Sequence, residues 1–129
     1  MLRTALKPVW LATLVLALVA AAVFVPLAEA GVNVDMIVQN VSVSDEKTTD
    51  LSVTIPETQG DLAMSMLRAA EEKIGYASLE YNDQVGKLSL VGAGMKSNPG
   101  VSFTFFDALA EHDINIDMIS TSEIRISVV

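Results

Sequence analysis

Side chains that commonly perform catalysis are sparse in this sequence. It contains no cysteine and one histidine, His112. The lack of cysteine excludes disulfides, thiolate metal sites and thiol nucleophiles. His112 has no second imidazole with which to share a metal, and it lies beside an expected helix end, where we expect a solvated cap residue. Gly92-Ala-Gly-Met-Lys-Ser97 does not satisfy the dinucleotide fingerprint because serine replaces its last glycine. We therefore expect no catalytic residue, no metal and no cofactor in this chain.

Binding of a small ligand is better supported by the residue pattern. The turn Asn98-Pro99-Gly100 leads into a helix expected from Val101, and the free N–H groups of a helix start suit a carboxylate. Gly100 has no side chain to block close approach. Polar residues at the ends of the following strands could meet the ammonium or side chain of a bound amino acid. The candidate ligand residues are Asn98, Pro99, Gly100, Val101, Asn115, Ser120, Thr121, Ser122 and Glu123, with Asn33, Asp35, Gln39 and Asn40 at the matching place nearer the N-terminus. The alternative is that Gln39, Asn40 and residues 120–123 only solvate strand ends and turns.

An internal repeat accounts for these two sets. Residues 24–37 (FVPLAEAGVNVDMI) match residues 106–119 (FDALAEHDINIDMI) at a constant offset of 82. The repeat also explains why Asp35 and Asp117 are equivalent, without an acid–base pair. Self-similarity of this kind indicates two copies of one structural unit.

The elements of the two copies complement each other. Apolar alternation and turn residues in the second copy predict a strand at 87–92, a helix at 101–111, and strands at 114–119 and 124–128. The first copy predicts strands at 32–41 and 49–55, a helix at 61–74 ended by a glycine, and a strand at 77–81. Overlaid, the copies give an α+β, ferredoxin-like unit with the order βαββαβ.

The N-terminal segment does not follow the repeat. Residues 9–27 carry no charge, and residues 1–30 resemble a secretory signal with an Ala28-Glu29-Ala30 cleavage pattern. An offset of 82 places the first strand at residues 5–10, where no alternation is seen, so we expect the first copy to lack its first strand and to follow an apolar helix. Cleavage after Ala30 would remove Phe24 and Leu27, whose counterparts lie on the second copy's helix. Residues 1–30 therefore remain open as a signal, an anchor or a product of gene joining.

These patterns divide the chain into an apolar segment (1–21), a first unit (22–84) and a second unit (85–129). From residue 31 onward six basic residues stand against fifteen acidic ones. This surplus of negative charge excludes nucleic acid as a partner, since affinity for phosphates comes from lysine and arginine. Contact with a membrane is expected only through residues 9–27.

Four segments resemble the paired ACT domains of aspartate kinase: LAEAGVNVDMIVQNVS (27–42), TTDLSVTIP (48–56), KLSLVGAGMKSNPGV (87–101) and INIDMISTSEIRISVV (114–129). The resemblance covers about residues 22–129. It implies a regulatory fragment for lysine or threonine feedback, located in the cytoplasm, without the kinase domain that lies upstream in the family. It also implies association as a homodimer through the ACT units, or with an aspartate kinase catalytic subunit.

The family continues through one more helix and strand, so we expect the second unit to lack these two elements. The open sheet edge would favour dimerisation or aggregation. Two alternative functions remain: an exported or membrane-anchored small-molecule-binding module, and a non-functional gene remnant.

Overall fold

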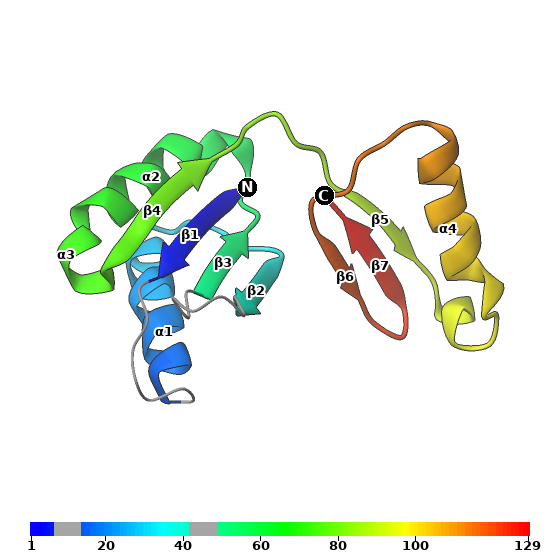
Figure 1. Ribbon diagram of the computed structural model, residues 1–129, viewed down its shortest axis with the longest axis horizontal. Helices are drawn as coiled ribbons and strands as arrows, with labels where there is room; N and C mark the ends of the chain where they lie inside the picture. Colours follow the sequence, from blue (N-terminus) through cyan, green and yellow to red (C-terminus); the bar gives the residue numbers. More distant parts are fainter. Residues whose placement is uncertain (7–13, 42–48) are drawn as a thin grey trace. The chain divides into compact units, whose positions relative to one another are not determined.

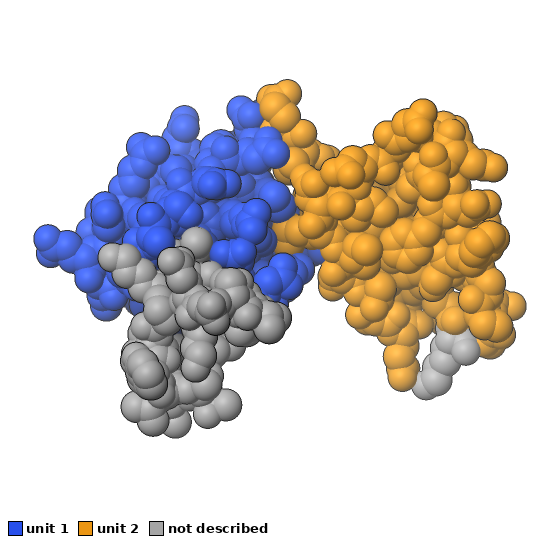
Figure 2. All heavy atoms as spheres, viewed as in Figure 1, with its two compact units in different colours: residues 1–83 blue, residues 84–129 orange. Residues whose placement is uncertain are grey.

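The computed structural model describes residues 1–6, 14–41 and 49–129. The chain forms two compact units, Met1–Asp83 and Gln84–Val129 (Figure 2). Residues 1–21 do not stand apart, however, because their described part belongs to the first unit.

The first unit is a four-stranded antiparallel sheet with helices packed against it (Figure 1). Its elements in chain order are β1 (Leu2–Leu6), α1 (Leu14–Glu29), β2 (Ile37–Val41), β3 (Thr49–Val53), the 3₁₀ turn η1 (Glu57–Gln59), α2 (Gly60–Ala69), α3 (Glu71–Ile74) and β4 (Tyr76–Tyr81). The strand order is β2-β3-β1-β4. Buried residues of β1, α1, β3, α2 and α3 form one core. The unit therefore has the whole βαββαβ topology.

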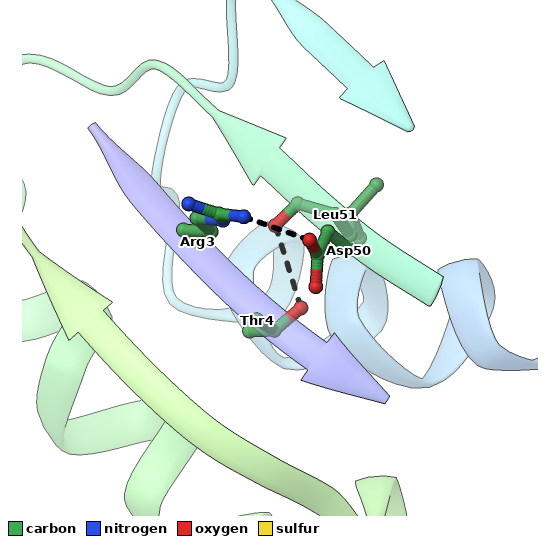
Figure 3. Close-up of polar contacts among 4 residues, drawn as sticks. All are labelled: Arg3, Thr4, Asp50 and Leu51. Atoms are coloured by element: carbon green, nitrogen blue, oxygen red, sulfur yellow. Dashed lines mark hydrogen bonds and ion pairs between the residues drawn. The ribbon is translucent and has the colours of Figure 1, made fainter. Parts of the chain in front are cut away.

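The expectation that this unit lacks its first strand is wrong. β1 lies in the middle of the sheet and pairs with both β3 and β4. Leu2 and Thr4 point to the core and are buried, while the Arg3 guanidinium bonds the Asp50 carboxylate on β3 at 2.7 Å (Figure 3). The Thr4 hydroxyl donates to the Leu51 carbonyl at 3.5 Å.

The register of the two sheets explains why a constant offset missed β1. Ile37 pairs with Val53 and Ile119 pairs with Val128, so Val53 and Val128 are equivalent. Leu2 pairs with Val53 and Leu88 with Val128, so Leu2 is equivalent to Leu88, at an offset of 86. The helices keep the offset of 82. By the offset of 82 the start of α4 at Gly100 maps to residue 18, whereas α1 begins at Leu14, so the four additional residues are the first turn of α1. The strand therefore lies at 2–6 rather than at 5–10.

The apolar N-terminal segment supplies the first helix of this unit and does not precede it. Val23 and Leu27 on α1 are buried in the core. Among the described residues no helix is both long enough and apolar enough to cross a membrane; α1 has 16 residues, and residues 9–13 of the apolar run lie outside the described part.

The sequence Ala28-Glu29-Ala30 forms the end of α1. Gly31 has a left-handed backbone (φ 72°), its N–H bonds the Ala28 carbonyl at 3.0 Å, and the Val32 N–H bonds the Leu27 carbonyl at 2.9 Å. This pair of bonds is the Schellman motif, which satisfies the last carbonyls of a helix. The cleavage-like pattern is therefore also a structural helix terminus, and a cut there would remove β1 and α1 from the core.

The second unit contains β5 (Leu88–Val91), the 3₁₀ turn η2 (Ala93–Lys96), α4 (Gly100–Glu111), β6 (Ile119–Thr121) and β7 (Arg125–Val128). The strand order β5-β7-β6 repeats the order β1-β3-β2 of the first unit. The helix α4 ends in the same motif as α1, with Asp113 (φ 53°) in place of Gly31. The described part of this unit is βαββ, as expected. Both strands expected after the first helices are shorter than predicted: β2 begins at Ile37 and β6 at Ile119.

Candidate functional site

A pocket of about 650 Å³ lies on the second unit between β5 and α4. Four predicted ligand residues, Asn98 to Val101, form one end of it. The remaining wall is mainly apolar and consists of Leu90, Thr104, Phe105 and Ala108. The pocket therefore combines a polar helix start with a hydrophobic wall, a composition typical of small-molecule sites.

The loop before α4 is held by bonds that converge on one carbonyl. The Asn98 amide side chain and its backbone N–H donate to the Gly94 oxygen at 2.9 and 3.0 Å. The Ser97 hydroxyl donates to the same oxygen at 3.4 Å. These bonds fix the turn that precedes the helix, so that α4 begins at a defined point beside the pocket.

The start of α4 is open to a ligand. Its N-cap residue, Pro99, makes no side-chain capping bond, and the first turn contains no acidic residue. The first N–H groups of a helix lack intrahelical acceptors and carry the positive end of the helix dipole. A Cβ built on Gly100 meets no atom within 4 Å. The Val101 N–H already donates to the Asn98 carbonyl at 3.1 Å. A carboxylate that approached the backbone at Gly100 would therefore meet the other N–H groups of the first turn and the positive end of the helix dipole.

Other candidate residues of the second unit lie away from this pocket. Asn115 donates to the Asp117 carboxylate at 2.9 Å. Ser122 belongs to the turn between β6 and β7, where its N–H bonds the Arg125 carbonyl at 2.7 Å. Ser120 and Thr121 are in β6, and Glu123 follows in the same turn. None of these residues lines the pocket, and the contacts of Asn115 and Ser122 fit the alternative of local turn stabilisation.

In the first unit the candidates are also dispersed. The Asn33 N–H donates to the Gln59 side-chain oxygen at 2.9 Å, and the Gln59 amide donates to the Gly31 carbonyl at 3.2 Å. The Asp35 N–H bonds the Thr54 carbonyl at 3.0 Å. Gln39 and Asn40 are exposed on β2, an edge strand. By the offset of 82, Asn98–Gly100 correspond to residues 16–18, which lie within α1 and form no turn. The loop between β1 and α1 is residues 7–13, outside the described part of the chain.

Sequence reasoning missed the apolar wall as part of a site. Val101, Phe105 and Ala108 recur at helical spacing, a pattern that indicates a core-facing stripe. Phe105 and Phe106 make an edge-to-face ring contact at 5.4 Å. The helical spacing of these apolar residues was visible in the sequence. It indicates an apolar helix face, but it does not reveal that part of this face lines a pocket.

The fold and this site define a class of protein. A βαββαβ unit followed by a described βαββ repeat is the ferredoxin-like arrangement of tandem ACT units. The ACT-domain family profile matches residues 17–70 and 88–129.

Known relatives narrow the class. The aspartokinase of Mycolicibacterium smegmatis is 52% identical over 109 residues, which are 84% of this chain and 26% of that protein. The aspartokinase of Corynebacterium glutamicum is 51% identical over the same share. A solved structure of aspartokinase alpha and beta subunits has a TM-score of 0.78 and 39% identity, covering 98% of this chain and 79% of that chain. The ligand-free regulatory subunit of aspartate kinase from Thermus thermophilus has a TM-score of 0.80 and 33% identity, covering 98% and 78%.

The chain belongs to the ACT-domain family, and within it to the regulatory region of the aspartokinases. It spans about a quarter of the length of the curated relatives that it matches.

Proposed function

We propose that the chain senses lysine or threonine through the pocket at the start of α4 and transmits this state to an aspartate kinase catalytic subunit. The observation that supports the proposal most is the open helix start of α4 beside Gly100, with no capping side chain and no acidic residue in the first turn. The α-carboxylate of an amino acid would bind these N–H groups. Its side chain would extend along the wall of Leu90 and Phe105.

Regulation requires two states that bind the effector with different affinity. An effector shifts the equilibrium only by that difference, and the catalytic partner must distinguish the same two states. The similar solved chains are described as a regulatory subunit and as alpha and beta subunits, which supports a separate catalytic partner for this chain. A homodimer through the ACT units is part of the proposal, as is a cytoplasmic location. The location is supported by α1, whose buried face is needed by the core of the first unit.

Thermal unfolding with added amino acids tests the effector. A ligand at one hundred times its dissociation constant adds about 2.7 kcal/mol to the stability of the state that binds it. We expect L-lysine or L-threonine to raise the unfolding temperature, and D-lysine and L-leucine to have no effect. If neither L-lysine nor L-threonine changes the unfolding of a folded sample at millimolar concentration, the effector proposal is wrong.

Two glycine variants localise the site. Gly100→Leu places a side chain at the helix start, where a Cβ meets nothing within 4 Å, so the fold should tolerate it while the carboxylate is excluded. Gly86→Leu is the matched control, since its Cβ is also unobstructed and Gly86 does not line the pocket. We expect the ligand-induced shift to be lost only in Gly100→Leu. Equal shifts in both variants would place the effector elsewhere.

A further inference from the structure

The connection between α1 and β2 is held by backbone bonds at its two ends. At its start the Gly31 and Val32 N–H groups bond carbonyls in the last turn of α1. At its end the Asp35 N–H bonds the Thr54 carbonyl at 3.0 Å. Between these ends lies Asn33, a predicted ligand residue of the first unit.

A single side chain, Gln59, holds the middle of this connection. Its Oε1 accepts from the Asn33 N–H at 2.9 Å, and its Nε2 donates to the Gly31 carbonyl at 3.2 Å. Only this orientation of the carboxamide satisfies both groups, because an N–H requires an acceptor and a C=O requires a donor. Among the described residues, neither backbone group has a backbone partner. Gln59 thus supplies both halves of a pairing that the backbone leaves open.

The residues on both sides of this contact are anchored in the first unit. The Gln59 N–H bonds the Pro56 carbonyl at 2.9 Å within η1. The next residue, Gly60, is buried and lies against the Tyr81 ring. Val32, between the two bonded backbone groups, belongs to the core. The Gln59 side chain itself is only half-buried, so it joins two fixed segments from a position that solvent and solutes can reach.

The same two backbone groups suit an amino acid. An amino acid presents an ammonium donor beside a carboxylate acceptor, and a carboxamide presents an N–H donor beside a carbonyl acceptor. Both can therefore bond one C=O and one N–H of an extended segment at the same time. The Gln59 carboxamide occupies the groups at which the head of an amino acid would bind this segment.

We propose that Gln59 is a built-in latch of the first unit. Its carboxamide takes the place of an amino acid at Gly31 and Asn33 and keeps this ligand segment closed, so that β2 starts from a fixed connection. The proposal concerns the first unit alone and does not depend on effector binding at the start of α4.

Hydrogen exchange of the Asn33 amide in the full chain tests the latch, because this N–H bonds the Gln59 side chain. Gln59→Met keeps the length of the side chain and removes both of its hydrogen-bonding groups. We expect the Asn33 amide to exchange about tenfold faster in this variant, while the Asp35 amide exchanges as before. Thr58→Met is the matched control, since Thr58 is exposed in the same 3₁₀ turn, and it should leave both amides unchanged.

Gln59→Glu separates hydrogen bonding from packing. The ionised carboxyl group has no donor for the Gly31 carbonyl, and its second oxygen is repelled by that carbonyl, whereas the protonated group has an O–H in place of Nε2. The charged residues that flank the contact on α1, β2, η1 and α2 are all acidic: Glu29, Asp35, Glu57 and Asp61. Their charge also favours the protonated form. Tyr81, beside Gly60, stays neutral below pH 7.

We expect the Asn33 amide of Gln59→Glu to be as protected as in the parent at about pH 4, and to exchange about tenfold faster than in the parent at about pH 7. The parent, measured at both pH values, corrects for the intrinsic exchange rate and for titration of the flanking carboxylates.

Three results would overturn the proposal. The first is equal Asn33 exchange in the parent and in Gln59→Met. The second is Asn33 exchange in Gln59→Glu that does not depend on pH relative to the parent. The third is a shift of the Asn33 amide resonance of the parent on addition of L-lysine or L-threonine, because an amino acid would then reach the segment. If neither amino acid binds the chain at all, the effector proposal fails, and the exchange of the two Gln59 variants still decides the latch.

Discussion

Gly60, the first residue of α2, is packed so closely against Tyr81 that a methyl group at this position should destabilise the first unit. A Cβ built on Gly60 lies 2.2 Å from the Tyr81 hydroxyl oxygen and 2.4 Å from its Cζ. Carbon atoms in contact are normally about 3.5–4.0 Å apart. The ring therefore has to move by more than 1 Å, and it belongs to a side chain that packs against the core from β4.

The magnitude follows from two opposing effects. Overpacking of this kind costs about 1–3 kcal/mol. Replacing glycine by alanine within a helix returns roughly 0.5–1 kcal/mol, because alanine loses less backbone entropy on folding. We expect Gly60→Ala to lower the free energy of unfolding of the first unit by about 1 kcal/mol, measured by urea denaturation with circular dichroism and by hydrogen exchange in β1.

A double-mutant cycle tests the cause. In a Tyr81→Leu background the shorter side chain no longer reaches Gly60, so Gly60→Ala should become stabilising by about 0.5–1 kcal/mol. The control is Gly86→Ala, whose Cβ meets no atom within 4 Å and whose effect should be the same in both backgrounds. If Gly60→Ala stabilises the parent and the Tyr81→Leu chain equally, the packing argument is refuted.

Three further predictions concern equivalent positions and the N-terminus. Leu2→Ala should lower the free energy of unfolding of the first unit by about 2–5 kcal/mol, because it opens a cavity at a buried site. Leu88→Ala, at the half-exposed equivalent position, should lower that of the second unit by about 1 kcal/mol or less. Hydrogen exchange in each sheet measures both values, and equal losses would contradict the difference in burial between the two leucines. Asp113→Gly should stabilise the second unit by roughly 0.5–1 kcal/mol, since Asp113 has a left-handed backbone that glycine adopts without strain; a loss of thermal stability would contradict this. Burial lowers the pKa of the Met1 α-amino group below 8.0, although the negative charge of Asp83 acts in the opposite direction. The folded chain therefore binds this proton more weakly than the unfolded chain does. The free energy of unfolding should consequently rise with pH from the lowered pKa up to about 8. Acetylation of Met1 should remove this slope between pH 6 and 9, and a slope that persists would assign it to other groups.

Several structural features were accessible from the sequence because they are local. The repeat at residues 24–37 and 106–119 predicted two equivalent units, and glycine at position 75 marked the end of α3, where its backbone is left-handed (φ 68°). The turn Asn98-Pro99-Gly100 correctly located the start of α4. The end of α1 was also visible as a repeated motif, but its resemblance to a cleavage site competed with the structural interpretation.

Other features depended on contacts between distant residues. Leu2-Arg-Thr-Ala-Leu6 alternates weakly, and it becomes a central strand only because β3 and β4 pair with its two edges. The four additional residues at the start of α1 moved the strand out of the expected place. The site was affected in the same way: the polar residues at 115 and 120–123 follow the right strands, but the fold directs their contacts to local turns.

The sequence by itself determined the family, the repeated unit and the loop before α4. Each of these depends on residues that are adjacent in the chain or repeat at a fixed spacing. Only the tertiary structure decided that the apolar N-terminus is a strand and helix of the first unit, since an apolar run fits a signal, an anchor or a core equally well until its partners are known. It also decided which equivalent leucine is covered. Leu2 and Leu88 pair with equivalent valines, Val53 and Val128. Their exposure differs because, among the described residues, β4 and α2 pack only beside Leu2.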